Sequence, residues 1–318
     1  MSESAVQDVV STVATETQVI MGGPSRTPFE WRPWVRQIIS FLGIILLLAF
    51  LWEASKFIGG TPWHLKISEG AWVDLDWQPP FYIPITNDLN MPHLWDILGA
   101  FPNPAQRNGP PLINVLVNAA FFTMFEALIG FVLGAGLGLL LGIVFVRSPL
   151  LERGLVPYVV ASQTVPILAI APMVVAWLQY GWWPVAIIAA YLTFFPVTIN
   201  TLRGLRSPDP RALELMRSYA ASERETLLKV RLPAAAPYIF TALKISATSS
   251  IVGAIIGELP SGISEGLGRA LLDFSRFYIT GPQKLWAALV VAAGVGILFF
   301  VVVVLAEKIV LRNVVREA

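Results

Sequence analysis

The longest uncharged stretch of this sequence constrains its fold more than any other feature. Between Arg153 and Arg203 lie 49 residues without a charged side chain. A membrane-spanning helix needs about 20 mostly apolar residues, so the stretch is long enough for two helices and too long for one. The segment Tyr-Gly-Trp-Trp-Pro at residues 180–184 divides it. The sequence therefore predicts an all-α polytopic membrane protein.

The composition excludes most soluble classes. Hydrophobic residues make up 55% of the 318 residues and charged residues only 14%, against about 25% charged in soluble proteins. The net charge of +1 gives no bulk field for a polyanion, so no nucleic-acid partner is expected. The absence of cysteine excludes disulfides and thiolate metal sites. With only His64 and His93 as histidines, no metal site and no catalytic residue are predicted.

Six membrane-spanning helices are predicted from the uncharged runs. The first lies within residues 36–58, the second runs through 112–146, and the third and fourth divide 154–202. The fifth covers 234–257, interrupted by Lys244, and the sixth covers 285–306. We expect residues 1–35 to be a flexible cytoplasmic tail without signal-peptide features. Residues 59–111 are predicted to form a Pro/Trp-rich extracytoplasmic loop, and residues 112–312 the core of five helices. Residues 313–318 are predicted to be a second cytoplasmic tail.

The distribution of basic residues predicts the orientation. With the N-terminus in the cytoplasm, 15 of the 22 Lys and Arg residues lie on the cytoplasmic side. Cytoplasmic flanks of membrane helices are enriched in Lys and Arg. Both termini are therefore predicted to be cytoplasmic.

Two glycine-containing patterns suggest chemistry, but each favours a structural role. The second span carries a GxxxG face repeated every four residues, which lets another helix approach closely. No strand or loop precedes it, as a phosphate-binding motif would require. Residues 262–266 formally match GxSxG, but the strand-to-helix turn and histidine base of a hydrolase are missing, so Ser264 is predicted to be a loop residue. The four predicted packing glycines are Gly130, Gly134, Gly138 and Gly142.

Residues 203–236 form the most informative loop. Asp209 and Pro210 are typical of a helix start, as N-cap and first helical residue. Apolar residues then recur at helical spacing: Ala212, Leu215, Met216 and Tyr219. A capping box at residues 222–225 predicts a second helix, which Pro233 is expected to end. The sequence contains no P-loop of its own. An exposed helical hairpin of this kind suits either docking to a partner or lying on a lipid surface.

This loop resembles the EAA loop of ABC-importer permeases. Glu214 takes the acidic position, Leu215 and Met216 stand for the two alanines, and Ala220 stands for the glycine, a substitution expected to be mild. Residues 230–233, Val-Arg-Leu-Pro, match the end of the pattern. Gln-Thr-Val-Pro at 163–166, Leu-Ala-Ile-Ala-Pro at 168–172, and Glu258 followed by Gly-Leu-Gly at 266–268 resemble the nitrate/sulfonate/taurine branch. The resemblance covers residues 113–312.

The resemblance implies a type I ABC-importer permease fold with a cytoplasmic coupling helix, in the plasma (inner) membrane of a prokaryote. Expected partners are a second permease copy, by default identical, two ATP-binding-cassette subunits that carry ATP and Mg, and an extracytoplasmic substrate-binding protein. This chain itself is expected to hold no cofactor. The implied contacts with the ATPase are Glu214, Arg217, Ser218, Ala220, Ala221, Leu232 and Pro233.

A translocation path is expected where prolines interrupt spans beside polar residues, because freed carbonyls need protein or water as partners. Glu126 and Glu258 both fall near the outer boundary, and Glu258 carries the family resemblance. Lys244 is expected to snorkel toward cytoplasmic headgroups; no basic residue then lies centrally in a span, which disfavours a fixed anion site. The predicted path residues are Gln163, Thr164, Pro166, Asn200, Thr248 and Glu258.

The sequence leaves the solute open among nitrate, bicarbonate, sulfonates such as taurine, and heterocyclic vitamins or their pyrimidine precursors. The alternative function is an ATPase-independent channel or secondary carrier. A carrier would usually show charged residues in mid-span and inverted repeats. A membrane enzyme is disfavoured by the scarcity of histidine and the absence of cysteine.

Overall fold

The computed structural model describes residues 33–68, 71–74, 77–179 and 181–317. The chain divides into two compact units, residues up to Ile58 and Gly59–Ala318. Nearly all of the tail predicted at 1–35 lies outside the described residues. The described part of the first unit is helix α2 (Pro33–Ile58), which is long and apolar enough to cross a membrane. It corresponds to the first predicted span.

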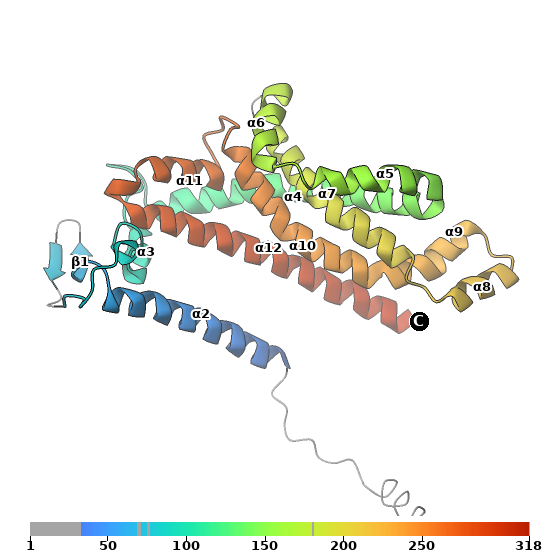
Figure 1. Cartoon of the computed structure of the whole chain (residues 1–318), viewed down its shortest axis with the longest axis horizontal. Helices are drawn as coiled ribbons and strands as arrows, with labels where there is room; N and C mark the ends of the chain where they lie inside the picture. The colour runs from blue at the N-terminus through green and yellow to red at the C-terminus, as the bar shows by residue number, and fades with distance from the viewer. Residues whose placement is uncertain (1–32, 69–70, 75–76, 180, 318) are drawn as a thin grey trace, which may run out of the picture. The chain divides into compact units, whose positions relative to one another are not determined.

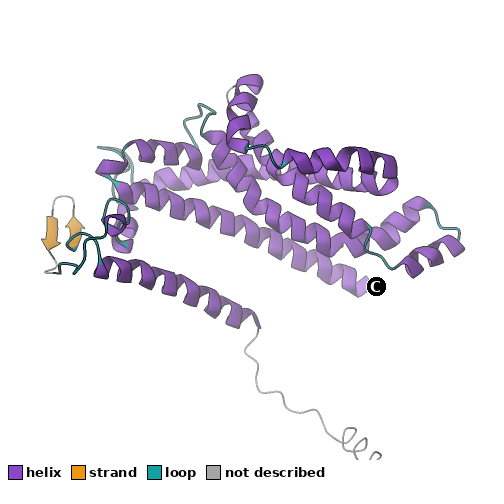
Figure 2. Ribbon diagram, viewed as in Figure 1, coloured by secondary structure: helices purple, strands orange, loops and turns teal. Residues whose placement is uncertain are grey.

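The second unit is almost wholly helical (Figures 1 and 2). Strands β1 (His64–Ser68) and β2 (Ala71–Asp74) pair antiparallel within the predicted extracytoplasmic loop. The predicted all-α class is confirmed, apart from this small hairpin. The elements in order are β1 (His64–Ser68), β2 (Ala71–Asp74), η1 (Pro84–Thr86), α3 (Leu94–Ala100), α4 (Leu112–Arg147), α5 (Pro149–Ser162), α6 (Ile167–Leu178), α7 (Trp182–Leu205), α8 (Pro210–Ser218), α9 (Glu223–Thr226), η2 (Leu227–Arg231), α10 (Leu232–Glu258), α11 (Leu267–Arg276), η3 (Tyr278–Thr280) and α12 (Pro282–Glu317).

The number of spans depends on one broken pair of helices. Within the described residues, five helices are long and apolar enough to cross a membrane, and the pair α5 and α6 makes a sixth if the two count together. They meet at an angle of 99°. The break falls on residues 163–166, where Pro166 caps α6 and cannot donate a backbone hydrogen bond. The third predicted span is thus two helices rather than one.

Helix α7 lies between α4 and α10, and small residues allow both close approaches. Successive glycines along α4 contact successive residues along α7, because Gly130 lies against Ala186 and Gly138 lies against Phe194. Helices α4 and α7 are therefore parallel, so α5 and α6 together must return the chain from one end of the pair to the other. Helix α10 is antiparallel to α7, since Gly253 meets Ala189 and Ser246 Oγ donates to the carbonyl of Thr193 at 3.3 Å.

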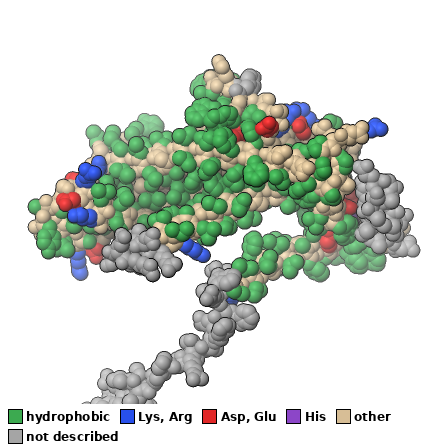
Figure 3. All heavy atoms as spheres, turned by 180° about the vertical axis from the view of Figure 1, so that it is seen from behind, with side chains coloured by type: hydrophobic (Ala, Val, Ile, Leu, Met, Phe, Trp, Pro, Cys, Tyr) green, Lys and Arg blue, Asp and Glu red, His purple; other side chains and the backbone are tan. Residues whose placement is uncertain are grey.

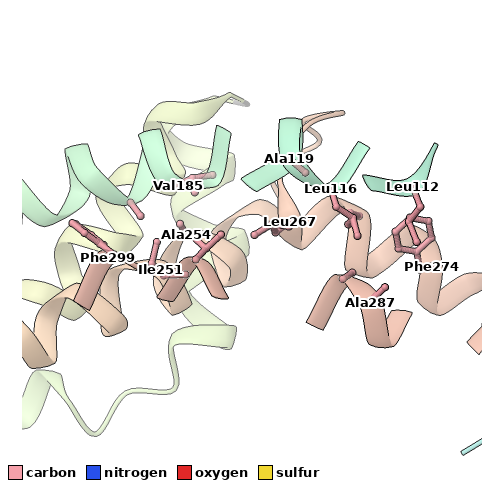
Figure 4. Packing of buried hydrophobic residues seen from close by; sticks show 14 of the residues in the cluster. Leu112, Leu116, Ala119, Val185, Ile251, Ala254, Leu267, Phe274, Ala287 and Phe299 are labelled. Carbon is pink, nitrogen blue, oxygen red and sulfur yellow. The ribbon is translucent and has the colours of Figure 1, made fainter. Parts of the chain in front are cut away.

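One hydrophobic cluster joins α4, α7, α10, α11 and α12 (Figure 4). Its labelled members include Leu116, Val185, Ile251 and Phe274. Helix α3 of the predicted loop contributes to the same cluster. Large apolar side chains also cover much of the outside of the second unit, whereas charged side chains lie mainly toward its two ends, one of which carries α8 and α9 (Figure 3). An apolar exterior of this kind suits lipid rather than water.

Candidate coupling and translocation sites

Helix α8 is exposed and begins as predicted. The Asp209 carboxylate accepts the backbone N–H of Arg211 at 2.8 Å, and Pro210 occupies the first turn. No residue of α8 is fully buried. The predicted apolar stripe divides in two, because Met216 is half-buried whereas Leu215 and Tyr219 are 56% and 77% exposed. These two side chains share a helix face one turn apart. Helix α8 therefore presents an apolar surface, bordered by the exposed side chains of Glu214, Arg217 and Ser218.

The end of α8 explains why the EAA pattern places glycine where this chain has Ala220. The backbone N–H of Ala221 donates to the Met216 carbonyl at 3.0 Å, and that of Ala220 to the Arg217 carbonyl at 2.9 Å. This pair of bonds defines a Schellman motif, which needs a left-handed residue after the helix. Ala220 adopts φ +50°. The substitution is therefore not mild, because a Cβ in this region costs about 1 kcal/mol.

Replacing Ala220 with glycine is expected to stabilise this turn by about 1 kcal/mol. The net gain is smaller than this, because glycine has more conformational entropy in the unfolded chain. The amides of residues 220 and 221 should then exchange with deuterium up to about fivefold more slowly. Hydrogen–deuterium exchange on the purified protein measures this. The control is Ala221→Gly, since the backbone of Ala221 is not left-handed. Equal exchange in both variants would contradict the expected strain.

The second half of the loop contains the predicted capping box. Ser222 N donates to Glu225 Oε2 at 2.9 Å, and Glu225 N donates to Ser222 Oγ at 3.3 Å. The prediction that Pro233 ends this helix is wrong. The π-helical turn η2 leads directly into α10, where Pro233 occupies the first turn. The π-helical turn before it locally changes the hydrogen-bond ladder, which accommodates a proline inside the continuous helix. Leu232 and Pro233 thus belong to α10 rather than to the exposed loop.

A groove of about 350 Å³ brings together part of the predicted path. Gln163, at the break between α5 and α6, lines it together with Thr248 of α10. Pro196, which lies inside α7, lines the groove as well. The remaining lining residues are Leu192, Phe195, Ile245, Ser249 and Val252. The groove is mainly apolar with a few hydroxyl and amide groups.

Other predicted path residues do not line this groove. Thr164 Oγ1 donates to the Ala161 carbonyl at 2.7 Å. Asn200 Nδ2 donates to the Pro196 carbonyl at 2.8 Å. Pro166 caps α6. Glu258 differs most from its prediction, because it is buried within the second unit and only 1% exposed. It is therefore neither part of the groove nor exposed to headgroup water.

Lys244 lies in the middle of α10, twelve residues after Leu232 and fourteen before Glu258. Its Nζ lies 2.9 Å from both carboxylate oxygens of Glu307 in α12. The expected snorkelling did not include this protein partner, which lies one residue beyond the predicted end of the sixth span. The sequence run 234–257 gave no sign of this pair, because the partner is 63 residues away. The two charges neutralise each other and fix α10 against α12.

Removing one member of this pair is expected to destabilise the protein. The side chains of Lys244 and Glu307 are 24% and 17% exposed, so a single Lys244→Met or Glu307→Leu leaves a poorly solvated charge. The expected cost is about 3 kcal/mol, which lowers Tm by roughly 5–10 °C. The double variant should regain most of this loss. Thermal unfolding in detergent measures the effect, and additive losses in the double variant would contradict the pairing.

The GxSxG segment lies between α10 and α11, rather than at a turn from a strand to a helix. Ser264 is exposed in the loop between α10 and α11. His93 is buried and stacks on Trp95, with ring centroids 4.0 Å apart. Ser264 is thus a loop residue, as predicted, and lines a cavity of about 610 Å³ with Arg269 and Asp273.

Comparison with known proteins identifies the family. Residues 134–314 match the model described as the binding-protein-dependent transport system inner membrane component. The chain belongs to this family. It is a multi-pass inner-membrane permease that serves as the transport subunit of an ABC importer of small solutes.

Several curated permeases are similar to this permease. The formylaminopyrimidine transport permease protein ThiX of Halalkalibacterium halodurans is 35% identical over 62% of this chain and 79% of its own length. The putative aliphatic sulfonates transport permease protein SsuC of Bacillus subtilis is 34% identical over 55% and 62%, respectively. The nitrate import permease protein NrtB of Leptolyngbya laminosa is 30% identical over 54% and 60%. The last two alignments thus cover less than two thirds of those relatives.

A solved structure shares the fold. The crystal structure of an amino acid ABC transporter with histidines aligns over 63% of this permease and 94% of the matched chain, with a TM-score of 0.50 and 15% identity. At this identity the similarity supports the fold alone. The ABC-importer permease fold expected from the sequence is therefore the fold of this chain.

Sequence reasoning missed residues whose partners are distant along the chain. Glu307 was not recognised as the counter-ion of Lys244. Thr123 and Glu126 of α4 were not connected with Glu258, although Thr123 Oγ1 donates to Glu258 Oε1 at 2.5 Å across 135 residues. The exposed Tyr219 had a local signal, because it follows Leu215 by one helical turn.

Proposed function

We propose that helix α8 and the break at Ala220 form the coupling element through which a separate ATPase drives this permease. The observation that carries the proposal is an exposed amphipathic helix, ended by a left-handed residue, in the segment that connects α7 to α10. Movement of α8 would reach α10 through η2, and Arg231 Nη1 ties this region to the Leu205 carbonyl at 3.1 Å. A helix that presents Leu215 and Tyr219 suits a groove on a partner protein. Glu214, Arg217, Ser218, Ala220 and Ala221 are the proposed contacts.

The complete transporter is proposed to contain two identical permeases, two ATP-binding-cassette subunits and an extracytoplasmic binding protein. ATP and Mg would bind the ATPase subunits. Both termini and α8 would face the cytoplasm, which places the basic flanks of α7 and α10 on the side that positive charge favours. ATP-driven closure of the ATPases would move the two α8 helices and switch the permeases between inward and outward openings.

The groove that Gln163 and Thr248 line is the proposed wall of the translocation path. Its few polar groups suit a weakly selective passage, in which the binding protein supplies most of the specificity. The proposed solute is a small anion of the nitrate or sulfonate type or a heterocyclic vitamin precursor, the solutes for which the similar permeases are named.

Purification of the tagged permease in mild detergent from its native membranes tests this assembly. One ATP-binding-cassette subunit per permease is expected, identified and counted by mass spectrometry, and it should be lost on Ala220→Trp. Isolation of the permease alone, or as an oligomer without a nucleotide-binding partner, would instead favour the channel or carrier function.

A further inference from the structure

Three helices meet at a buried acidic cluster that the proposed transport path does not use. Glu126 of α4 and Glu258 at the end of α10 are 0% and 1% exposed. Their carboxyl groups lie beside each other, because Glu126 follows Thr123, a hydrogen-bond donor to Glu258, by one helical turn. Thr123, one turn before Glu126, donates to Glu258 Oε1 at 2.5 Å and accepts the backbone N–H of Leu267 at 2.8 Å. The cluster thus connects α4 and α10 with the first turn of α11.

The backbone of α11 is shaped around the Glu258 carboxylate. The N–H group of Gly268 donates to it. Gly266 has φ +99°, and a Cβ there would overlap the Glu258 carboxylate. A Cβ on Gly268 would overlap the carbonyl of Ile255. Only glycine fits at both positions. The missing side chains let the backbone of this loop approach the carboxylate closely enough to donate a hydrogen bond to it.

Glu126 occupies a different environment, because neither of its carboxylate oxygens has a donor among the described protein groups. No Lys, Arg or His side chain pairs with it in the described residues, and the nearby Arg269 pairs with Asp273 at 3.0 Å. A buried, unpaired carboxylate is strongly unfavourable. Two ionised carboxylates can only accept hydrogen bonds, so their contact requires a hydrogen on one of them.

We propose that Glu126 and Glu258 form a proton-binding site in which one proton bridges the two carboxyl groups. Two adjacent carboxyl groups cannot both ionise without strong repulsion, which favours retention of one proton. The proton lies on Glu126, because Glu258 already accepts hydrogen bonds from Thr123 and Gly268, whereas Glu126 accepts none in the described residues. The bridged pair holds the N-terminus of α11 against α4 and α10. It thereby positions the loop whose Ser264 and Glu265 line the 610 Å³ cavity.

Infrared difference spectroscopy on the full-length protein in D₂O at neutral pH tests the site. Wild type minus Glu126→Gln should show the C=O stretch of one protonated carboxyl group per chain. Glutamine supplies the missing donor to Glu258 and keeps the shape of protonated Glu126, so this variant should fold. Glu265→Gln, at an exposed acidic residue, is the control and should retain the band. A wild-type spectrum without the band, or a band unchanged in Glu126→Gln, would overturn the proposal.

Hydrogen–deuterium exchange provides a second readout that does not depend on transport. Glu258→Ala should expose the amides of Leu267 and Gly268 and increase their exchange at least tenfold. Glu126→Gln should leave their protection within about twofold of wild type. A comparable loss of protection in Glu126→Gln would show that its carboxyl group is needed in ionised form, which would also overturn the proposal. Neither experiment requires the ATPase, so a failure here is distinct from a failure of the proposed coupling.

Discussion

Gly134→Leu is expected to prevent α4 from packing against α7 and to abolish recovery of folded permease. A Cβ at this position would overlap the Ala190 carbonyl and lie 2.6 Å from Thr193 Cβ. Both obstacles belong to the backbone or to a rigid β-branched side chain, so no rotamer change relieves the clash. Added methylene groups in a packed core typically cost about 1–3 kcal/mol. A leucine against helix backbone should cost at least about 3 kcal/mol.

Gly136→Leu is the matched control, two residues along the same helix. A Cβ at Gly136 would have no atom within 4 Å. The same substitution there should be tolerated, and the gain in helix propensity favours it by up to about 1 kcal/mol. Size-exclusion profiles and yields in detergent compare the two variants. Equal recovery of Gly134→Leu and Gly136→Leu would contradict the parallel α4–α7 contact.

Glu214→Arg and Ala220→Trp are each expected to abolish solute uptake while leaving the permease folded in the membrane. Glu214 is exposed. Reversal of its charge therefore changes the surface that a partner protein would contact and leaves the packing of the core unchanged. At Ala220 the left-handed backbone already disfavours a side chain, and a tryptophan adds bulk at the turn between α8 and α9. Uptake by cells or vesicles and co-purification of the ATPase measure both variants.

The control for the coupling variants is Glu265→Arg, an equivalent charge reversal in the loop between α10 and α11. It should retain the ATPase in detergent, because it lies at the opposite end of α10 from the coupling loop. Normal uptake by both Glu214→Arg and Ala220→Trp would count against docking of α8 to an ATPase. Loss of ATPase binding in Glu265→Arg would show that charge reversal disturbs the assembly without regard to position.

Local patterns in the sequence predicted much of the fold because they depend on neighbouring residues. The α8 start at Asp209 and the capping box at Ser222 occur where their side chains can bond to nearby backbone. Long uncharged runs identified α4, α7 and α10 within a few residues of their bounds, whereas α12 continues eleven residues beyond the predicted end at 306. The same local reasoning failed at Pro233, because whether a proline ends a helix or begins the next depends on the geometry of the preceding turn.

The sequence by itself determined the membrane class, the spacing of the coupling loop and the glycine face of α4, since each follows from periodicity along one helix. Only the tertiary structure decided which face met which partner. The glycines of α4 pack against α7, and Lys244 forms an ion pair with Glu307. Glu258, which was expected to line the path, lies at the centre of a buried cluster. The physical reason is the low dielectric of the interior. A buried charge must find a partner, and that partner can lie anywhere along the chain.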